Sequence, residues 1–374
     1  MFSYDLGRHL ERLPRPRYDE FQVPALAVGL YDWVVAFDHN AERAWMIATG
    51  FPELHPTRRR SRAQRRLAWF RRRLATTSAP TYRRRSSKPV ELQGPCFCVN
   101  RGLPGLLSNF DRPSYLAHVR RAVEHVHAGD CFQVNLAQRL LYPASLSAEN
   151  VYERLRHCSP AFFAAYFDLG DYQLASSSPE RFLCLDGNQV QTFPIKGTRP
   201  RGTTPAEDER LMEELSHSPK DRAENIMIVD LLRNDLGRVC QFGSVSVPAV
   251  CRLETFRDVH HLVSEVRGTL RADRDGIDLL QAAFPGGSIT GAPKIRAMQI
   301  IAELEPHARG AYCGSLGFLG FNGTLDTNIL IRTMTIGGGW IQFHVGGGIV
   351  ADSIPENEYE ETWHKARGLI RAIR

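Results

Sequence analysis

The alternation of apolar and polar residues divides the chain into strands and helices. Residues Pro24 to Phe37 are mostly apolar and rich in Val and Ala, which predicts a buried strand. The run from Ala44 to Thr49 is short enough to be either its partner strand or part of a helix. An Asn322-Gly323 turn predicts a hairpin that joins 312–321 to 324–336. Further strands are predicted at 132–141, 162–168, 172–177, 181–185, 189–193, 244–254, 260–270 and 340–350.

Helical spacing and capping residues predict the remaining elements. Ser114 is a candidate cap for a helix that ends at Gly129, and Pro293 begins another that runs to Glu305. Further helices are predicted at 149–157, 205–216, 219–236 and 355–373. Long strands interspersed with helices are typical of an α+β fold. We therefore expect a large two-sheet, mostly antiparallel β-sandwich flanked by helices.

One basic segment dominates the charge of the chain. The 374 residues carry a net charge of +6, but residues 58 to 88 contain twelve Arg, one Lys and no acid, so the remainder carries −7. Leu67, Phe70 and Leu74 lie at helical spacing within it, which predicts a basic amphipathic helix, followed by a loop from Ser78 to Lys88. We divide the chain into a divergent N-terminal region (1–107), which contains this insert, and a catalytic region (108–374). We expect the latter to form one globular unit with the N-terminal strands.

Several functional classes are disfavoured by the sequence. No apolar run of about 18 residues predicts a membrane span, and no signal-peptide pattern occurs at the N-terminus, so we expect a cytoplasmic protein. The eight cysteines form no Cys-x-x-Cys pair, which favours reduced thiols. The basic segment leaves nucleic-acid binding open as a distant alternative. That reading is disfavoured because the segment has few aromatic residues and no recognition motif.

A lysine in apolar surroundings is the first candidate catalytic residue. Lys196 lies between Ile195 and Gly197, directly after a predicted strand, in a segment that we expect to be mostly buried. Loss of solvation lowers the pKa of a lysine amine and makes its neutral, nucleophilic form accessible. The alternative is a solvated loop lysine, which describes most lysines.

Two pairs of acidic residues are candidates for metal binding. Asp221 and Glu224 are three residues apart on one predicted helix, and Glu358 and Glu361 are three apart on the last helix, four residues before Lys365. Carboxylate oxygens on two helices suit a hard dication with open positions, such as Mg²⁺. The alternative is that both pairs are simply solvated.

Two further features carry possible chemistry. Gly346, Gly347 and Gly348 end a predicted strand shortly before the last helix, and adjacent glycines expose backbone N–H groups to an anion. A flexible turn is the alternative. Glu180 follows Pro179 after another predicted strand, where an apolar environment would make it a general acid.

These segments occur together in a recognisable order. The motifs are SSSPERF, PIKGTRPRG, DRAENIMIVDLLRND, VHHLVSEVRG, FPGGSITGAPK, AYCGSLGF, TNILIRT and VGGGIVADSIPENEYEETWHKA. In this order and spacing they resemble the chorismate-utilising enzymes, a family that includes anthranilate, aminodeoxychorismate, isochorismate and salicylate synthases. The resemblance is dense from Asp111 to Arg374. Several long motifs in order are far more specific than one short motif.

The resemblance implies a role for each candidate residue. Lys196 attacks C2 of chorismate, Glu180 protonates the departing C4 hydroxyl, and ammonia then adds at C4 and expels the lysine. Mg²⁺ binds the ring carboxylate of chorismate, assisted by Lys365 and the amides of Gly346, Gly347 and Gly348. The metal residues are Glu224 and Glu361 as ligands, with Asp221 and Glu358 holding water. The other substrate-binding residues are Gln133, Thr198, His261, Thr290, Tyr312 and Arg332; Arg332 and Tyr312 hold the enolpyruvyl carboxylate.

Two positions distinguish the subfamilies. Anthranilate-forming relatives carry Ala in place of Lys196, whereas aminodeoxychorismate-forming relatives carry lysine. Water-using relatives carry a lysine base where this chain has Gln133, and a neutral amide cannot take a proton from water. The resemblance is therefore greatest to the aminodeoxychorismate-forming members, with anthranilate synthesis as the alternative. No glutaminase motif occurs, so the expected ammonia source is solution or a separate glutamine amidotransferase subunit.

Overall fold

The chain divides into two compact units. In the computed structural model, residues 1–76, 88–99, 101–256 and 259–374 are described. One unit comprises Met1–Leu26 and Arg84–Arg374, and the other comprises Ala27–Arg83. The contacts thus separate the chain at 26/27 and 83/84, whereas the predicted division lay at 107/108. All sixteen candidate site residues belong to the larger unit.

One sheet of the larger unit has seven strands, and all its pairings are antiparallel. Their order is β10 (Ile195–Pro200), β12 (Val259–Thr269), β9 (Gln189–Thr192), β8 (Arg181–Asp186), β15 (Leu325–Ile329) and β14 (Ser315–Leu319), with β11 (Ser246–Thr255) also paired to β12. The register places Lys196 opposite Leu262 and Thr198 opposite His261, with an irregularity between Lys196 and Thr198. This sheet therefore brings the lysine strand and His261 together.

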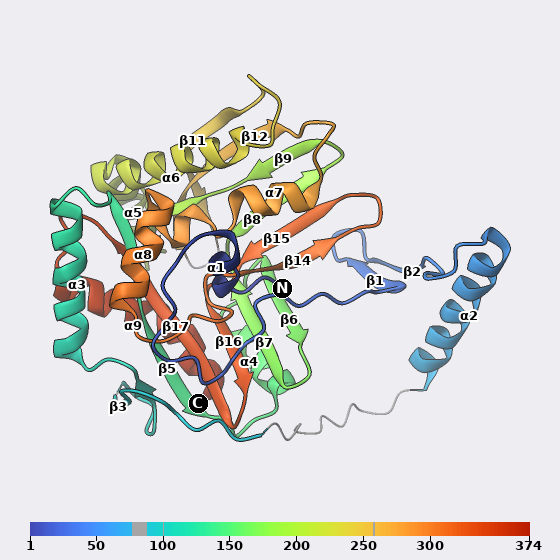
Figure 1. The fold of residues 1–374 in the computed structure, drawn as a ribbon, viewed down its shortest axis with the longest axis horizontal. Coiled ribbons are helices and arrows are strands. Elements are labelled where there is room, and N and C mark those ends of the chain that lie inside the picture. Colours follow the sequence, from blue (N-terminus) through green and yellow to red (C-terminus); the bar gives the residue numbers. More distant parts are fainter. Residues whose placement is uncertain (77–87, 100, 257–258) are drawn as a thin grey trace. The chain divides into compact units, whose positions relative to one another are not determined.

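The second sheet has eight strands, again with antiparallel pairing throughout. Its order is β3 (Phe97–Cys98), β4 (Leu107–Ser108), β5 (Gln133–Pro143), β17 (Trp340–Ile349), β16 (Thr333–Gly337), β7 (Tyr172–Ser178) and β6 (Phe163–Asp168), with β13 (Gly291–Ala292) also paired to β5. β5 and β17 run side by side along their length (Figure 1). Gly348 lies opposite Asn135, so the glycine segment adjoins the start of β5, where Gln133 lies.

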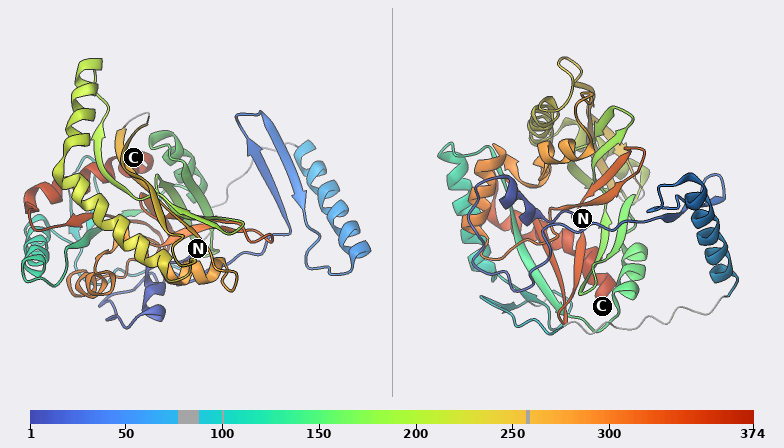
Figure 2. Two further views of the ribbon diagram at one scale, coloured as in Figure 1. Left: turned by 90° about the horizontal axis from the view of Figure 1, so that it is seen from above. Right: turned by 45° about the vertical axis from the view of Figure 1, so that its right-hand side comes forward.

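Helices cover the two sheets and enclose a shared core. The helices are α1 (Gly7–Leu10), α3 (Arg112–His127), α4 (Ala148–Cys158), α5 (Pro205–His217), α6 (Pro219–Gly237), α7 (Gly276–Ala283), α8 (Lys294–Leu304) and α9 (Pro355–Ile373), with short 3-10 turns η1 (Tyr4–Leu6) and η2 (Gly287–Ile289). α5 and α6 pack on the seven-stranded sheet, and α3, α4 and α9 on the eight-stranded one (Figure 2). One apolar cluster includes Leu183 and Val266 of the first sheet and Leu136 and Phe343 of the second. Burial of each such side chain contributes about 1.5–3 kcal/mol.

The smaller unit is a hairpin with a basic helix. β1 (Trp33–Asp38) pairs with β2 (Arg43–Ala48), and α2 (Pro56–Ala75) follows. The ring of Trp33 contacts Phe70 at 4.7 Å between centroids, and Arg66 Nε donates to Asp32 at 3.0 Å. Arg62 also pairs with Asp32, at 3.5 Å. The helix therefore contacts the hairpin segment through aromatic rings and two arginines, while most of its arginines are exposed.

The observed fold confirms the predicted α+β class, and several elements differ in extent. The strand predicted for Pro24–Phe37 begins only at Trp33, and α3 is capped by Asp111, whose carboxylate accepts from the Ser114 amide. The second arm of the predicted hairpin splits into β15 and β16, which lie in different sheets. The sequence patterns missed α7, and the predicted loop Ser78–Lys88 lies almost entirely outside the described residues. Among the helices described, none combines the length and apolar character needed to cross a membrane.

Candidate active site

Lys196 and Glu180 meet at the Gly-rich turn before α8. The Lys196 ammonium donates to the Ser288 carbonyl at 3.3 Å, and the Ser288 hydroxyl donates to the Glu180 carboxylate at 2.7 Å. Lys196 lies on β10, Glu180 between β7 and β8, and Ser288 in η2. Three segments distant in sequence thus place the predicted nucleophile and the predicted acid around one residue.

The environment shifts the pKa values of these two groups in opposite directions. Burial lowers the pKa of the Lys196 amine below its usual value, although the carboxylates of Glu224 and Glu180 oppose this shift. Burial raises the pKa of the Glu180 carboxyl to about 7, against the Ser288 hydrogen bond and the Lys196 charge. Glu180 is 6% exposed. The pair therefore holds a carboxyl that is partly protonated near neutral pH and an amine that loses its proton more readily than usual.

A neutral histidine lies on β12, and an arginine lies in the connection between β15 and β16. The ring nitrogen Nδ1 of His261 lies 2.8 Å from the Thr198 hydroxyl. Burial and the positive charge of Arg332 lower the pKa of His261 to about 4, so the ring is neutral at pH 7. Arg332 connects β15 and β16 with a backbone φ of 50°. Within the described residues its guanidinium has no hydrogen-bond partner, so the group is available to a carboxylate ligand.

Tyr312 and Thr290 are both buried, with different roles. The Tyr312 ring stacks on His344, with centroids 5.1 Å apart and planes at 12°. The Thr290 hydroxyl donates to the Gly286 carbonyl at 2.9 Å, and its own carbonyl accepts from the Asn135 amide at 2.9 Å. Thr290 therefore fixes the Gly-rich turn against β5.

The side-chain amide of Gln133 is buried and has no hydrogen-bond partner among the described residues. Its side chain is fully buried, and within the described part of the chain neither its amide oxygen nor its amide nitrogen has a hydrogen-bond partner. A Cβ atom added to Gly348 would come within 2.8 Å of this amide carbon. Since unpaired buried polar groups are costly, an amide in this state is suited to bind a polar ligand.

The acidic residues of α9 gather beside the glycine segment. A Cβ atom added to Gly347 would lie 3.3 Å from carboxylate oxygens of both Glu358 and Glu361, and 3.7 Å from Lys365 Nζ. Lys365 forms an ion pair with Glu361 at 2.6 Å and donates to the Gly346 carbonyl at 2.8 Å. A side chain at 347 would therefore crowd these two carboxylates, and glycine lets the backbone of β17 approach them.

The carboxylate of Glu224 on α6 belongs to the same electrostatic group. Burial raises the pKa of Glu224, which Lys196 opposes and Glu361 reinforces. Burial likewise raises the pKa of Glu358. At Glu361 burial acts in the same direction, but Lys365, Lys220 and Lys196 together outweigh it and lower the pKa. Carboxylates close enough to raise each other's pKa compete for protons or for a cation.

The predicted magnesium residues form a partial oxygen-donor set. Among the described residues, no group of three or more acidic, His or Cys side chains is close enough to form a complete metal site. Asp221 is engaged by Arg199 at 3.3 Å. The carboxylate oxygens of Glu358 and Glu361, which lie together beside the backbone of Gly347, fit a hard dication whose remaining positions are filled by water and a ligand carboxylate.

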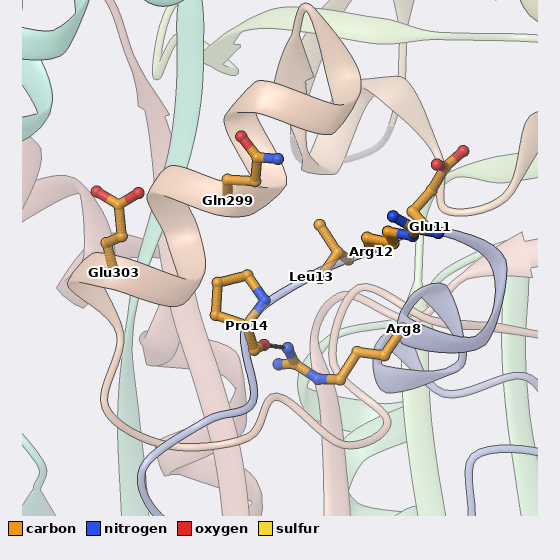
Figure 3. A pocket seen from close by; sticks show the side chains of 7 residues that line it. All are labelled: Arg8, Glu11, Arg12, Leu13, Pro14, Gln299 and Glu303. Carbon is orange, nitrogen blue, oxygen red and sulfur yellow. Dashed lines mark hydrogen bonds between the residues drawn. The ribbon is translucent and has the colours of Figure 1, made fainter.

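The surface pocket drawn in Figure 3 is a separate feature. It lies between the segment around Arg12 and helix α8, and it is lined by Arg8, Glu11, Arg12, Leu13, Pro14, Gln299 and Glu303. The Arg8 guanidinium donates to the Pro14 carbonyl within it. None of the candidate catalytic residues lines this pocket, so it is not part of the candidate active site.

Sequence reasoning missed two residues that connect the candidate site. Ser288 joins Lys196 to Glu180, and Asn135 joins β5 to the Thr290 carbonyl. The position of Ser288 within the Gly-rich turn was a usable signal, since such turns bring backbone groups close to ligands. Asn135 offered no signal, because its contacts depend on how β5 packs against β17 and against Thr290, which follows η2.

The sequence as a whole matches one family. The model of the chorismate binding enzymes matches residues 1–371, so the chain belongs to that family. Relatives of two activities are similar to it to the same degree. Aminodeoxychorismate synthase component 1 of Salmonella typhimurium (strain LT2) is 43% identical over 375 residues, covering 100% of this chain and 76% of the relative. Anthranilate synthase component 1 of Thermus thermophilus is 42% identical over 371 residues, covering 99% and 76%.

A solved structure agrees with this assignment. The anthranilate synthase component I of Streptococcus pneumoniae superimposes with a TM-score of 0.81 at 30% identity, covering 99% of this chain and 79% of that one. The menaquinone-specific isochorismate synthase MenF of Escherichia coli, at 23% identity and a TM-score of 0.66, shares the fold. Overall similarity does not separate the two aminating activities, so individual site residues must do so.

Proposed function

We propose that the chain is an aminodeoxychorismate synthase component I, which converts chorismate and ammonia to 4-amino-4-deoxychorismate. The observation that carries this proposal is Lys196 beside Glu180, bridged by Ser288, with pKa values shifted toward a nucleophile and an acid. Relatives of both activities match equally well, and the lysine is the residue that favours this product. Anthranilate formation is the alternative.

The proposed reaction divides one displacement into two. The neutral Lys196 amine forms a bond to C2 of chorismate as the ring double bond shifts and the C4–O bond breaks. Glu180 supplies the proton with which the C4 hydroxyl leaves as water. Ammonia then bonds to C4, the double bond shifts back, and the lysine, bound to C2 as a secondary ammonium, leaves as a neutral amine. The ammonium group formed at C4 returns its extra proton to the Glu180 carboxylate. Covalent catalysis of this kind replaces one difficult step by two easier ones.

The remaining residues orient the substrate. The Arg332 guanidinium, which lacks a partner among the described residues, suits the enolpyruvyl carboxylate, and we assign the buried Tyr312 to the same carboxylate. The neutral imidazole of His261, hydrogen-bonded to Thr198, and the turn held by Thr290 border the ring. The unpaired Gln133 amide suits a neutral nucleophile, because it can hydrogen-bond to ammonia without taking its proton.

Magnesium and a partner subunit complete the proposal. Glu361 and Glu224 would hold Mg²⁺, with Glu358 and Asp221 binding its waters and Lys365 and the glycine segment beside it. When bound, the ion would neutralise the ring carboxylate of the substrate. Since no glutaminase motif occurs in the sequence, a separate glutamine amidotransferase subunit would supply ammonia from glutamine.

The product decides between the two activities. The purified chain is incubated with chorismate, Mg²⁺ and an ammonium salt at raised pH, and the mixture is analysed by chromatography with and without an added aminodeoxychorismate lyase. We expect p-aminobenzoate only after the lyase is added, and no fluorescent anthranilate. Anthranilate as the main product would overturn the proposal.

The covalent role of Lys196 has its own test. With a slow substrate analogue, a mass adduct should form on the Lys196 peptide of the wild type and not in Lys196→Ala. The exposed Lys88 serves as an internal control for non-specific labelling. Wild-type turnover in Lys196→Ala, without any adduct on the wild-type peptide, would refute the nucleophile role.

A further inference from the structure

A buried arginine, which has no assigned role so far, donates hydrogen bonds to several segments of the candidate site. Arg309 is 2% exposed, and its partner Glu305 is 5% exposed. The guanidinium donates twice to this carboxylate, from Nε at 2.8 Å and from Nη2 at 2.6 Å. A bidentate pair of this kind fixes the plane and direction of the guanidinium.

The remaining donors of Arg309 reach two segments that carry candidate substrate residues. Nη2 donates to the Asn135 carbonyl at 2.9 Å, two residues after Gln133 on β5. Nη1 donates to the Ile289 carbonyl at 3.3 Å, directly before Thr290. Glu305 strengthens the first link, because it also accepts from the Ala137 amide at 2.8 Å.

Two further contacts extend the connection. The Arg309 guanidinium lies 5.5 Å from the ring centre of Tyr312 and 4.6 Å from that of Tyr4, as in cation–π contacts. With its amide oriented to suit both neighbours, the Asn135 side chain accepts from Arg309 at 3.3 Å and donates to the Gly347 carbonyl at 3.2 Å. One side chain is thereby connected to β5, the Gly-rich turn, Tyr312 and the glycine segment.

We propose that Arg309, held by Glu305, is a positioning residue that fixes Gln133, Thr290, Tyr312 and Gly347 relative to one another for chorismate binding. The inference rests on the proposed function, because it assigns these four residues to one substrate. Arg309 does not face the substrate itself. It acts through the backbone carbonyls and the ring that it contacts.

The geometry explains why this position needs arginine. All three guanidinium nitrogens donate: Nε and Nη2 to Glu305, Nη2 also to Asn135, and Nη1 to Ile289. The ammonium of a lysine keeps the charge but not the planar, forked arrangement of donors, so it cannot reproduce all these bonds together. Arg309→Lys therefore preserves the charge balance of the buried pair and removes the alignment, which makes it the informative variant.

Arg139 provides a matched control. It is equally buried, forms a 2.9 Å ion pair with Glu20, and lies over the ring of Phe21 at 5.8 Å. Like Arg309, it therefore combines a carboxylate with an aromatic contact, but no hydrogen bond connects it to a predicted site residue. Arg139→Lys reports what loss of a buried guanidinium does to stability alone, since the Nε and Nη2 of Arg139 have no hydrogen-bond partner among the described residues.

The experiment compares Arg309→Lys, Arg139→Lys and the wild type in ammonia-dependent turnover, thermal melting and amide hydrogen exchange. We expect both variants to melt at lower temperature. Only Arg309→Lys should lose kcat/KM for chorismate, by about tenfold or more, and should exchange faster over residues 287–292. A kcat/KM within about twofold of Arg139→Lys, at equal folded fraction, would overturn the proposal.

A second variant keeps the test decisive if Arg309→Lys does not fold. Asn135→Ala leaves the Arg309–Glu305 pair intact and removes the link to Gly347. It should raise KM for chorismate about threefold to tenfold, the effect of losing about one hydrogen bond. An unchanged KM would overturn the proposal. If the wild type forms no aminodeoxychorismate, the proposed function fails, whereas the exchange measurements on residues 287–292 still decide whether Arg309 positions the turn.

Discussion

Burial shifts the pKa values of individual side chains in the candidate site, and this changes their chemistry. Glu180 and Lys196 are ordinary groups whose pKa values move toward each other because neither charge is well solvated. Ser288 contacts both, so the two groups share one environment. At this scale the structure supports acid and nucleophile roles that the two residue types alone would not specify.

The raised pKa of Glu180 predicts a pH dependence of stability. A carboxyl whose pKa is about 7 in the folded state and 4.5 otherwise contributes stability at low pH that is lost as the pH rises through 7. The expected loss between pH 5 and 8.5 is at most about 3 kcal/mol. Unfolding curves of Glu180→Gln should lack this loss, because the amide does not titrate.

The control for this measurement is Glu303→Gln. The Glu303 side chain is 41% exposed, and its replacement should leave the pH dependence of the wild type unchanged. The same buried acid should make ammonia-dependent kcat, corrected for free ammonia, decline above about pH 7. Parallel stability curves for the wild type and Glu180→Gln would contradict the assignment.

Helices and strands position these groups through their periodicities. α6 and α9 each carry two acidic residues three positions apart, and the glycines of β17 leave its backbone accessible beside α9. The sequence predicted both helical pairs because a spacing of three places side chains on one face. It could not predict that Asp221 is engaged by Arg199, since that contact joins α6 to β10.

The helical acids predict magnesium-dependent stabilisation. Glu361→Gln keeps the size of the side chain and removes one charged oxygen donor. We expect Mg²⁺ to raise the melting temperature of the wild type and not of this variant, with ammonia-dependent kcat reduced about a hundredfold or more. Glu360→Gln is the control, because Glu360 pairs with Arg101 at 2.7 Å and belongs to the same helix. Equal magnesium responses in both variants would remove Glu361 from the metal site.

Sequence-based prediction fails where a contact joins residues that are far apart in the sequence. The order of motifs identified Lys196, Glu180 and Arg332, and strand patterns gave β5 and β17 closely. Arg309 went unrecognised, because its importance lies in carbonyl groups that become neighbours only when β5, η2 and α8 meet. The split of the predicted hairpin arm at Arg332 was missed for a similar reason. An alternating apolar pattern does not show at which residue the chain passes from one sheet to another, as it does between β15 and β16.

The molecule as a whole separates the candidate chemistry from its basic segment. All candidate site residues lie in the unit formed by Met1–Leu26 and Arg84–Arg374, whereas the arginine-rich helix α2 lies in Ala27–Arg83. The excess positive charge of the chain therefore belongs to a unit that contributes none of the proposed catalytic groups.

Replacing residues 27–83 by a short Gly/Ser bridge should therefore spare the chemistry. We expect ammonia-dependent kcat/KM for chorismate within about threefold of the full chain, because no proposed catalytic or substrate-binding residue is removed. The measurement is repeated with glutamine and an added amidotransferase subunit. Loss of the glutamine-driven reaction alone would assign subunit docking to the smaller unit, and loss of both would show that the larger unit depends on it.

The half-buried amine of Lys196 also offers a route to selective inhibition. An amine with a lowered pKa condenses with an aldehyde, forming an imine and releasing water, more readily than the protonated lysines on the surface. A small aromatic aldehyde that also carries a carboxylate could direct that anion to the unpaired guanidinium of Arg332. Relatives with alanine in place of Lys196 could bind such a compound only reversibly and without a covalent bond. A single amine would then decide which members of the family a drug inactivates.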